Sequence, residues 1–182
     1  YLYSGGSNGI TCADGSPATL SRSTPDGTWT YTRSESGTAS TTTITDPQSN
    51  QTVIQFQGFY ETERSTYQGS SSGTLLQTID TCYNGSTSPC TGLTISPPVT
   101  QVAVTTTLPG SAHLQSKTVT KYNSYGLATE ADQYDFGGAT PVLKTISTYN
   151  TALTNNIVDH PSTVQVYNGS GGLVAQTSYT YD

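Results

Sequence analysis

The sequence predicts an all-β protein: an extended antiparallel meander of about ten or eleven strands, with no significant helix. Composition is the first observation behind this prediction. Thr and Ser are the two most frequent residue types among the 182 residues, with 18 Gly and 13 Tyr, whereas Leu, Ala, Lys and Glu are scarce. β-Branched and aromatic side chains pack well on a pleated sheet, and the scarce types are the good helix formers. Second, short alternating segments separated by Gly, Pro, Asn and Asp follow one another almost from end to end.

The expected strands recur at intervals of about 8 to 15 residues, which is typical of antiparallel hairpins rather than of parallel strands joined by helices. Turn sequences such as Pro25-Asp26-Gly27 and Leu108-Pro109-Gly110 separate them. The expected strands are 28–33, 39–45, 52–57, 59–67, 74–82, 100–107, 114–122, 127–134, 142–149, 162–167 and 173–181.

Two parts of the chain contain few strand-forming residues, and they predict the domain organisation. Residues 1–25 are rich in Gly and Ser, so we expect a loose leader, or a strand-exchange segment completed by a neighbour. Residues 26–182 form the β repeat domain. A weak boundary is expected near 96–98, because Pro97 and Pro98 cannot donate to a strand ladder.

The charge balance argues against a nucleic-acid partner. The net charge is -6 and Lys and Arg number only 6, too few for a basic groove. No apolar run reaches the roughly 18 to 20 residues of a spanning helix, so we expect no membrane span. A hydroxyl-rich, lysine-poor surface favours an extracellular or cell-surface location.

Two of the three cysteines are candidates for a disulfide. Cys82 and Cys90 bracket a short turn-prone loop, and closing it would stabilise the fold by about 2.5 kcal/mol. The alternative is two unrelated small apolar residues; a metal site is not indicated, because no second Cys or His pair lies nearby. Cys12 is left as a buried thiol, as half of a bridge to a partner outside this segment, or as half of an intermolecular bridge.

A faint internal repeat lies toward the C-terminus. Residues 118–127 align with 163–168 followed by 171–173, and each copy leads through a second strand to a Tyr-Asp pair. Physically, the unit is a hairpin in which Gly supplies the positive φ of the turn and Tyr lies on the sheet face. The repeat residues are Tyr122, Gly126, Tyr134 and Asp135 in the first copy and Tyr167, Gly172, Tyr181 and Asp182 in the second.

This pattern resembles the Rhs, or Tyr-Asp-repeat (YD-repeat), family of bacterial cell-surface and secreted proteins. The resemblance is best over residues 114–182 and weaker over 28–83. Asp46-Pro47 with Asn50 is similar to the family's Asp-Pro-x-Gly-Asn turn, with Ser49 in place of Gly, and the arginine that often follows the turn Gly is absent from both repeats. The resemblance implies a spiral of antiparallel sheet, of which this chain would be part of a wall.

No catalytic motif stands out. His113 and His160 are the only histidines, and no Gly-x-Ser-x-Gly elbow presents a serine. Glu61 and Glu63 are spaced to share one strand face, where paired carboxylates could serve a hydrolase or lyase. We expect instead a non-enzymatic protein without cofactor or metal, and keep the hydrolase or lyase on a β scaffold as the second alternative.

The leading interpretation is therefore a structural wall segment or a surface fibre subunit. Few charges protect its strand edges, so its partners would be other copies of itself or flanking repeats of the same polypeptide. The first alternative is an adhesion module that binds surface glycans or another surface by stacking on Trp29 and Tyr31. Three triplets fit the N-glycosylation rule: Asn50, Asn84 and Asn168.

Overall fold

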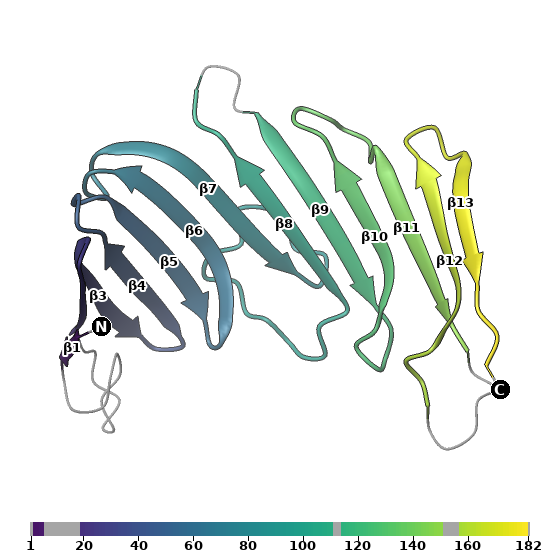
Figure 1. The fold of residues 1–182 in the computed structure, drawn as a ribbon, viewed down its shortest axis with the longest axis horizontal. Coiled ribbons are helices and arrows are strands. Elements are labelled where there is room, and N and C mark those ends of the chain that lie inside the picture. The colour runs from purple at the N-terminus through teal and green to yellow at the C-terminus, as the bar shows by residue number, and fades with distance from the viewer. Residues whose placement is uncertain (1, 6–18, 111–113, 151–156, 182) are drawn as a thin grey trace. The chain divides into compact units, whose positions relative to one another are not determined.

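The computed structural model describes residues 2–5, 19–110, 114–150 and 157–181, and within them the chain is all-β with no helix (Figure 1). This confirms the predicted fold class, an antiparallel meander. The described residues form thirteen strands. Their bounds are β1 Leu2–Gly5, β2 Thr19–Thr24, β3 Gly27–Ser36, β4 Ala39–Thr45, β5 Gln51–Gln57, β6 Tyr60–Gln68, β7 Thr74–Tyr83, β8 Gln101–Thr107, β9 Gln115–Tyr122, β10 Ala128–Tyr134, β11 Leu143–Tyr149, β12 Pro161–Asn168 and β13 Leu173–Ser178.

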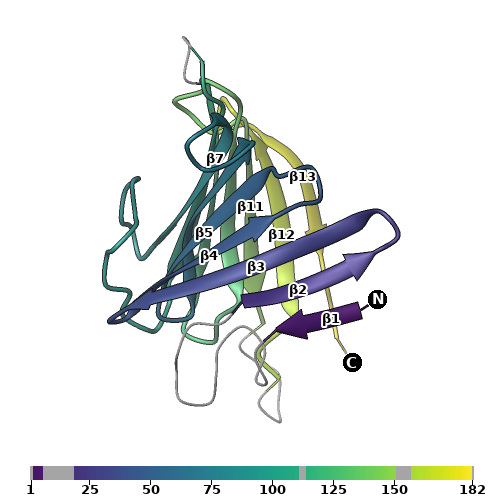
Figure 2. The ribbon, with the colours of Figure 1, turned by 90° about the vertical axis from the view of Figure 1, so that its left-hand side faces the viewer.

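Every expected strand is present, and two further strands, β1 and β2, lie within residues 1–25. β1 pairs with β2 and β2 pairs with β3, both antiparallel (Figure 2). The Gly- and Ser-rich composition hid these two strands, because neither carries the alternation of apolar and polar residues that marks a strand in sequence. Residues 6–18 of the expected leader lie outside the described part of the chain.

The chain divides into two compact units. Unit 1 contains Tyr1–Thr81, Pro89–Ile95 and Thr107–His113, and unit 2 contains Cys82–Ser88, Ser96–Thr106 and Leu114–Asp182. In unit 1 each strand from β1 to β7 pairs antiparallel with the next. In unit 2 the same holds for β9 to β13, which lie side by side in chain order (Figure 1).

The side chains that the sheet buries are mostly polar. Thr62 is only 1% exposed, and its hydroxyl donates to the Gln55 carbonyl at 3.2 Å. Ser65 is 3% exposed and donates to Glu63 Oε1 at 3.0 Å. Backbone ladders and hydroxyl hydrogen bonds therefore carry much of the cohesion that an apolar core usually supplies. The buried residues are Ser40, Thr42, Thr62, Ser65, Asp80, Thr105 and Asp132, beside the apolar Ile54, Cys82 and Cys90.

A β-bulge in β6 overturns one expectation. Phe56 of β5 pairs with Glu61 while its neighbour Gln55 pairs with Glu63, so Thr62 is the extra residue. Because adjacent residues of β5 face opposite sides, Glu61 and Glu63 also face opposite sides. The prediction that these two carboxylates share a face was wrong, because one inserted residue reverses the alternation of a strand.

Three hairpin turns share one hydrogen-bond pattern. The first residue is Asp or Asn, and its backbone N–H donates to the carbonyl of the residue four positions on. Its Oδ1 accepts the N–H groups two and four positions on. The carboxylate or amide thus replaces the ladder bonds that the turn interrupts. These turns are 46–50, 123–127 and 168–172.

The fourth residue of each turn adopts positive φ. The angles are 67° at Ser49, 75° at Gly126 and 81° at Gly171. The sequence alignment expected Gly172 to match Gly126, but the structure places Gly171 there. Only Gly171 combines the left-handed backbone with the N–H that donates to the first residue's carbonyl.

Candidate functional site

Cys82, near the end of β7, and Cys90 form a disulfide, as the sequence predicts. Both are buried. The disulfide closes the loop that contains the Asn-Gly turn. Its two cysteines are the buried apolar residues of this otherwise polar segment. Cys12 lies outside the described residues, so its role stays a prediction.

The side chain of Asn84 makes hydrogen bonds to the backbone of the segment that follows this loop. It adopts a φ of 54°, and its Oδ1 accepts the Thr100 N–H at 2.8 Å while its Nδ2 donates to the Ser96 carbonyl at 2.8 Å. A glycan on Nδ2 would leave that nitrogen one N–H and would compete for space with the bond to Ser96. Of the three sequons, Asn84 therefore has a structural use that competes with glycosylation.

The other two sequons differ in how their amide nitrogens are used. Asn50 Nδ2 donates to Asp46 Oδ2 at 3.0 Å, so this sequon is also engaged in its turn. Asn168 uses Oδ1 to hold its turn, and its Nδ2 makes no hydrogen bond within the described chain. Asn168 is thus the sequon whose geometry best accommodates a glycan.

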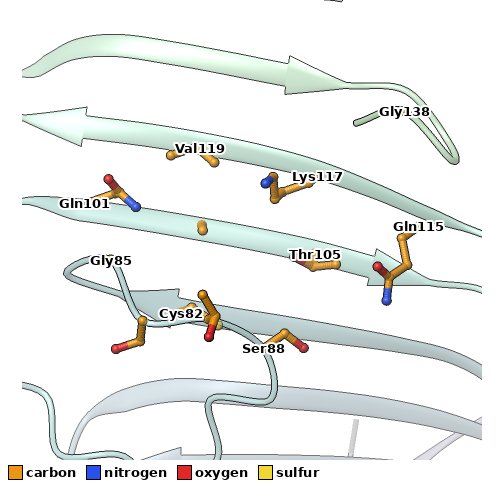
Figure 3. A pocket seen from close by; sticks show the side chains of 12 residues that line it. Cys82, Gly85, Ser88, Gln101, Thr105, Gln115, Lys117, Val119 and Gly138 are labelled. Carbon is orange, nitrogen blue, oxygen red and sulfur yellow. The ribbon is translucent and has the colours of Figure 1, made fainter. Parts of the chain in front are cut away.

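A hollow of about 350 Å³ lies in unit 2, over β8 and β9. Figure 3 shows Gln101 and Thr105 on one strand and Lys117 on the next, with the loop through Gly85 and Ser88 beside them. Its lining offers hydroxyl, amide and ammonium groups. The sulfur of Cys82, which also lines it, is held in the disulfide and is no nucleophile.

A charged cluster joins three neighbouring strands of unit 2. Lys121 Nζ lies 2.8 Å from Glu130 Oε1, and Lys144 Nζ lies 3.0 Å from the same oxygen and 3.3 Å from Asp132 Oδ1. The hydrogen bonds from Lys121 and Lys144 hold the pKa of Glu130 below its ordinary value. The hydrogen bond to Glu130, with help from Asp132, raises the pKa of Lys144. Lys144 is thus an ion-pair partner of the buried Asp132, whose Oδ1 accepts no hydrogen bond within the described chain, and the ion pairs link β9, β10 and β11.

The repeat residues lie at strand ends and turns. The ammonium of Lys117 lies over the ring of Tyr134, 4.3 Å from the ring centroid. Asp182 lies outside the described residues. The remaining members are Tyr122, Gly126, Asp135, Tyr167, Gly172 and Tyr181.

A second tyrosine pattern escaped the sequence alignment. The Tyr149 hydroxyl, at the end of β11, donates to the Ala128 carbonyl at the start of β10, at 2.8 Å. The Tyr181 hydroxyl, just after β13, donates to the Pro161 carbonyl at the start of β12, also at 2.8 Å. Each tyrosine thus bonds the first carbonyl of the strand before its own. The signal in sequence is a Tyr-Asx pair, Tyr149-Asn150, which matches Tyr181-Asp182.

Trp29 and Tyr31 lie on the same face of β3 and are half-buried. Trp29 is flanked by two hollows of unit 1. One, of about 570 Å³, is lined by Arg22, Thr24, Pro25, Asp26 and Trp29. The other, of about 430 Å³, extends from Trp29 over β4, β5 and β6.

His160 Nδ1 lies 2.9 Å from Asp159 Oδ1, and its ring meets Tyr181 edge-on with centroids 4.6 Å apart. The hydrogen bond from His160 lowers the pKa of Asp159. His113 lies outside the described residues. In the part of the chain that the structure describes, no three His, Cys, Asp or Glu side chains gather to hold a metal ion.

No protein-family model matches the chain, and no curated protein matches it. Among the described residues, no helix is long and apolar enough to cross a membrane.

Proposed function

We propose that this chain is a non-enzymatic, extracellular structural segment, a YD-repeat-like wall or surface-fibre subunit that continues its sheet by pairing an edge strand with a further strand. The partner is another copy of the chain or a flanking repeat of the same polypeptide. The observation that carries the proposal is β13. All of its residues are exposed, and its sequence LVAQTS contains no charged residue and no Pro. Natural sheets usually protect a free edge with such residues.

The backbone of β13 supports the same conclusion. The Tyr179 N–H donates to the Ser162 carbonyl at 2.9 Å, toward β12. Backbone groups alternate in direction along a strand, so those of Gln176 and Ser178 point away from β12. Within the described chain no strand pairs with that side. These outward groups provide the ladder that an added antiparallel strand would use.

The recurring turns and tyrosines support a repeat architecture. The turns 123–127 and 168–172 have the same hydrogen bonds, and Tyr149 and Tyr181 make equivalent bonds. Ser49 adopts the left-handed backbone that the family's turn assigns to Gly. The disulfide supports an extracellular location, because disulfides persist in oxidising compartments.

Sedimentation velocity and electron microscopy of the full chain over rising concentration test the proposal. We expect concentration-dependent association. The double variant Val174→Lys with Ser178→Lys, which charges the β13 edge, should remain monomeric. The matched control, Ser124→Lys with Tyr125→Lys, adds equal charge at an exposed turn and should associate like the parent. A monodisperse parent at high concentration, or equal behaviour of the two variants, would contradict pairing between copies of the chain.

A further inference from the structure

Arg22 is a cation with no counterion among the residues that the structure describes. Its Nε is buried without a hydrogen-bond partner in that part of the chain. The other two arginines are paired: Arg33 Nε lies 2.8 Å from Glu35, and Arg64 binds Glu61 through two nitrogens. Burying an unsatisfied donor of a charged group is costly, so this guanidinium is poorly compensated within the described chain, and an anion at its accessible end would be favourable.

The residues around Arg22 indicate which kind of ligand could supply that anion. Arg22 of β2 pairs in register with Trp29 of β3, and its guanidinium carbon lies 5.6 Å from the centroid of the Trp29 ring. Both residues line the hollow of about 570 Å³, and Thr24, Pro25 and Asp26 complete its lining. A cation and an aromatic ring thus face one space.

We propose that this hollow binds a carboxylate-bearing sugar, such as a uronic acid unit of an acidic polysaccharide. The guanidinium fork of Arg22 matches the two oxygens of a carboxylate. The indole of Trp29 offers a flat apolar surface to the C–H face of the sugar ring. The Asp26 carboxylate can accept hydrogen bonds from sugar hydroxyls, and its negative charge disfavours a doubly charged group such as phosphate more than a singly charged carboxylate.

The second hollow extends the site. Trp29 also lines the space of about 430 Å³, where Thr52, Thr66 and Gln68 add neutral hydrogen-bonding groups. A neighbouring sugar unit of the chain would find hydroxyl and amide partners there, beside the Asp46 carboxylate that also lines this hollow. The ligand class is therefore an oligosaccharide rather than an isolated organic acid. This inference does not depend on pairing of the β13 edge.

Trp29 is the only tryptophan of the chain, so its fluorescence reports on this site alone. The experiment titrates the full chain, at concentrations where it is monomeric, with oligogalacturonate, its methyl ester and a neutral oligogalactan. We expect a saturable change in Trp29 fluorescence with oligogalacturonate and at least about tenfold weaker binding of the two uncharged sugars. Arg22→Gln should weaken oligogalacturonate binding by about tenfold or more.

The matched control is Arg33→Gln, which removes the same charge from an arginine that also lies over an aromatic ring, Phe56, at 5.7 Å. It should bind like the parent. Circular dichroism establishes that each variant is folded. The proposal is overturned if oligogalacturonate leaves Trp29 fluorescence unchanged, if the uncharged sugars bind equally well, or if folded Arg22→Gln binds like the parent. Equal weakening by Arg33→Gln would also overturn it, because binding would then follow net charge.

Discussion

Ser49 occupies a backbone conformation that costs an L-residue free energy. Its φ of 67° places it in the left-handed region, where its two structural equivalents are Gly126 and Gly171. The Asp46 carboxylate compensates by accepting the N–H groups of Gln48 and Asn50. The hydrogen bond from Asn50 lowers the pKa of Asp46, so the carboxylate stays charged for this task.

Exchanging residues at this position tests the equivalence of the turns. Left-handed backbone costs an L-residue roughly 1–2 kcal/mol, and the flexibility of Gly offsets about 0.5–1 kcal/mol of that. We therefore expect Ser49→Gly to raise the free energy of unfolding by about 0.5–1 kcal/mol. Gly126→Ala should lower it by a similar amount through backbone strain alone, because an added Cβ meets nothing within 4 Å. Urea denaturation measures both, and effects of the same sign would contradict the assignment.

The Glu130 cluster makes stability depend on pH in the acid range. The pKa of Glu130 is lowered in the folded protein by Lys121 and Lys144. Its stabilisation is therefore complete above the ordinary Glu pKa of about 4.3 and is lost as the pH falls through the lowered folded value. In thermal unfolding from neutral to acid pH, the parent should be more stable than Glu130→Gln near neutrality. The difference should close in acid; a difference that is constant with pH would exclude this role.

At the scale of elements, the disulfide between Cys82 and Cys90 constrains the loop that it closes. The variant Cys82→Ser with Cys90→Ser should lose about 2.5 kcal/mol of unfolding free energy, because the unfolded chain regains the entropy of the open loop. Chemical denaturation with and without reductant measures this loss. Reductant should destabilise the parent by the same amount and leave the double variant unchanged. A parent insensitive to reductant after denaturation would contradict the bridge.

The strands themselves were largely predictable, and the bulges were not. The strand Ala39–Thr45 has the predicted ends because its Thr run is bounded by Gly and by the Asp46-Pro47 turn. Thr62 carries no signal of being an extra residue, since a bulge is decided by pairing with β5. Glu61 and Glu63 face opposite sides of the sheet only because β6 pairs with β5 through this bulge.

At the scale of the whole molecule, each described strand pairs within its unit only with the strands next to it in the sequence. In unit 2 the strand pairings from β9 to β13 are all between consecutive strands. Stability in such an array is close to a sum of nearest-neighbour terms, so it declines toward an edge that has one neighbour.

Hydrogen exchange followed by mass spectrometry tests this distribution. In dilute, monomeric samples, amides of β13 should exchange fastest among the unit 2 strands, and those of β10 and β11 slowest. At concentrations where the chain associates, protection of β13 should rise, because an added strand would cover its outward groups. Uniform protection in the dilute sample would instead indicate one cooperative sheet.

Sequence alone determined the fold class, most strands and the disulfide, because alternation, turn residues and loop length are local properties of the chain. It also offered Trp29 and Tyr31 as candidates for stacking on a glycan, which stays a prediction. Only the tertiary structure decided that Arg22 lies against Trp29 with no counterion among the described residues, that Gly171 rather than Gly172 matches Gly126, and that no described strand pairs with the outer side of β13. These features depend on which strands pair and in what register, and register is set by contacts between residues far apart in the chain.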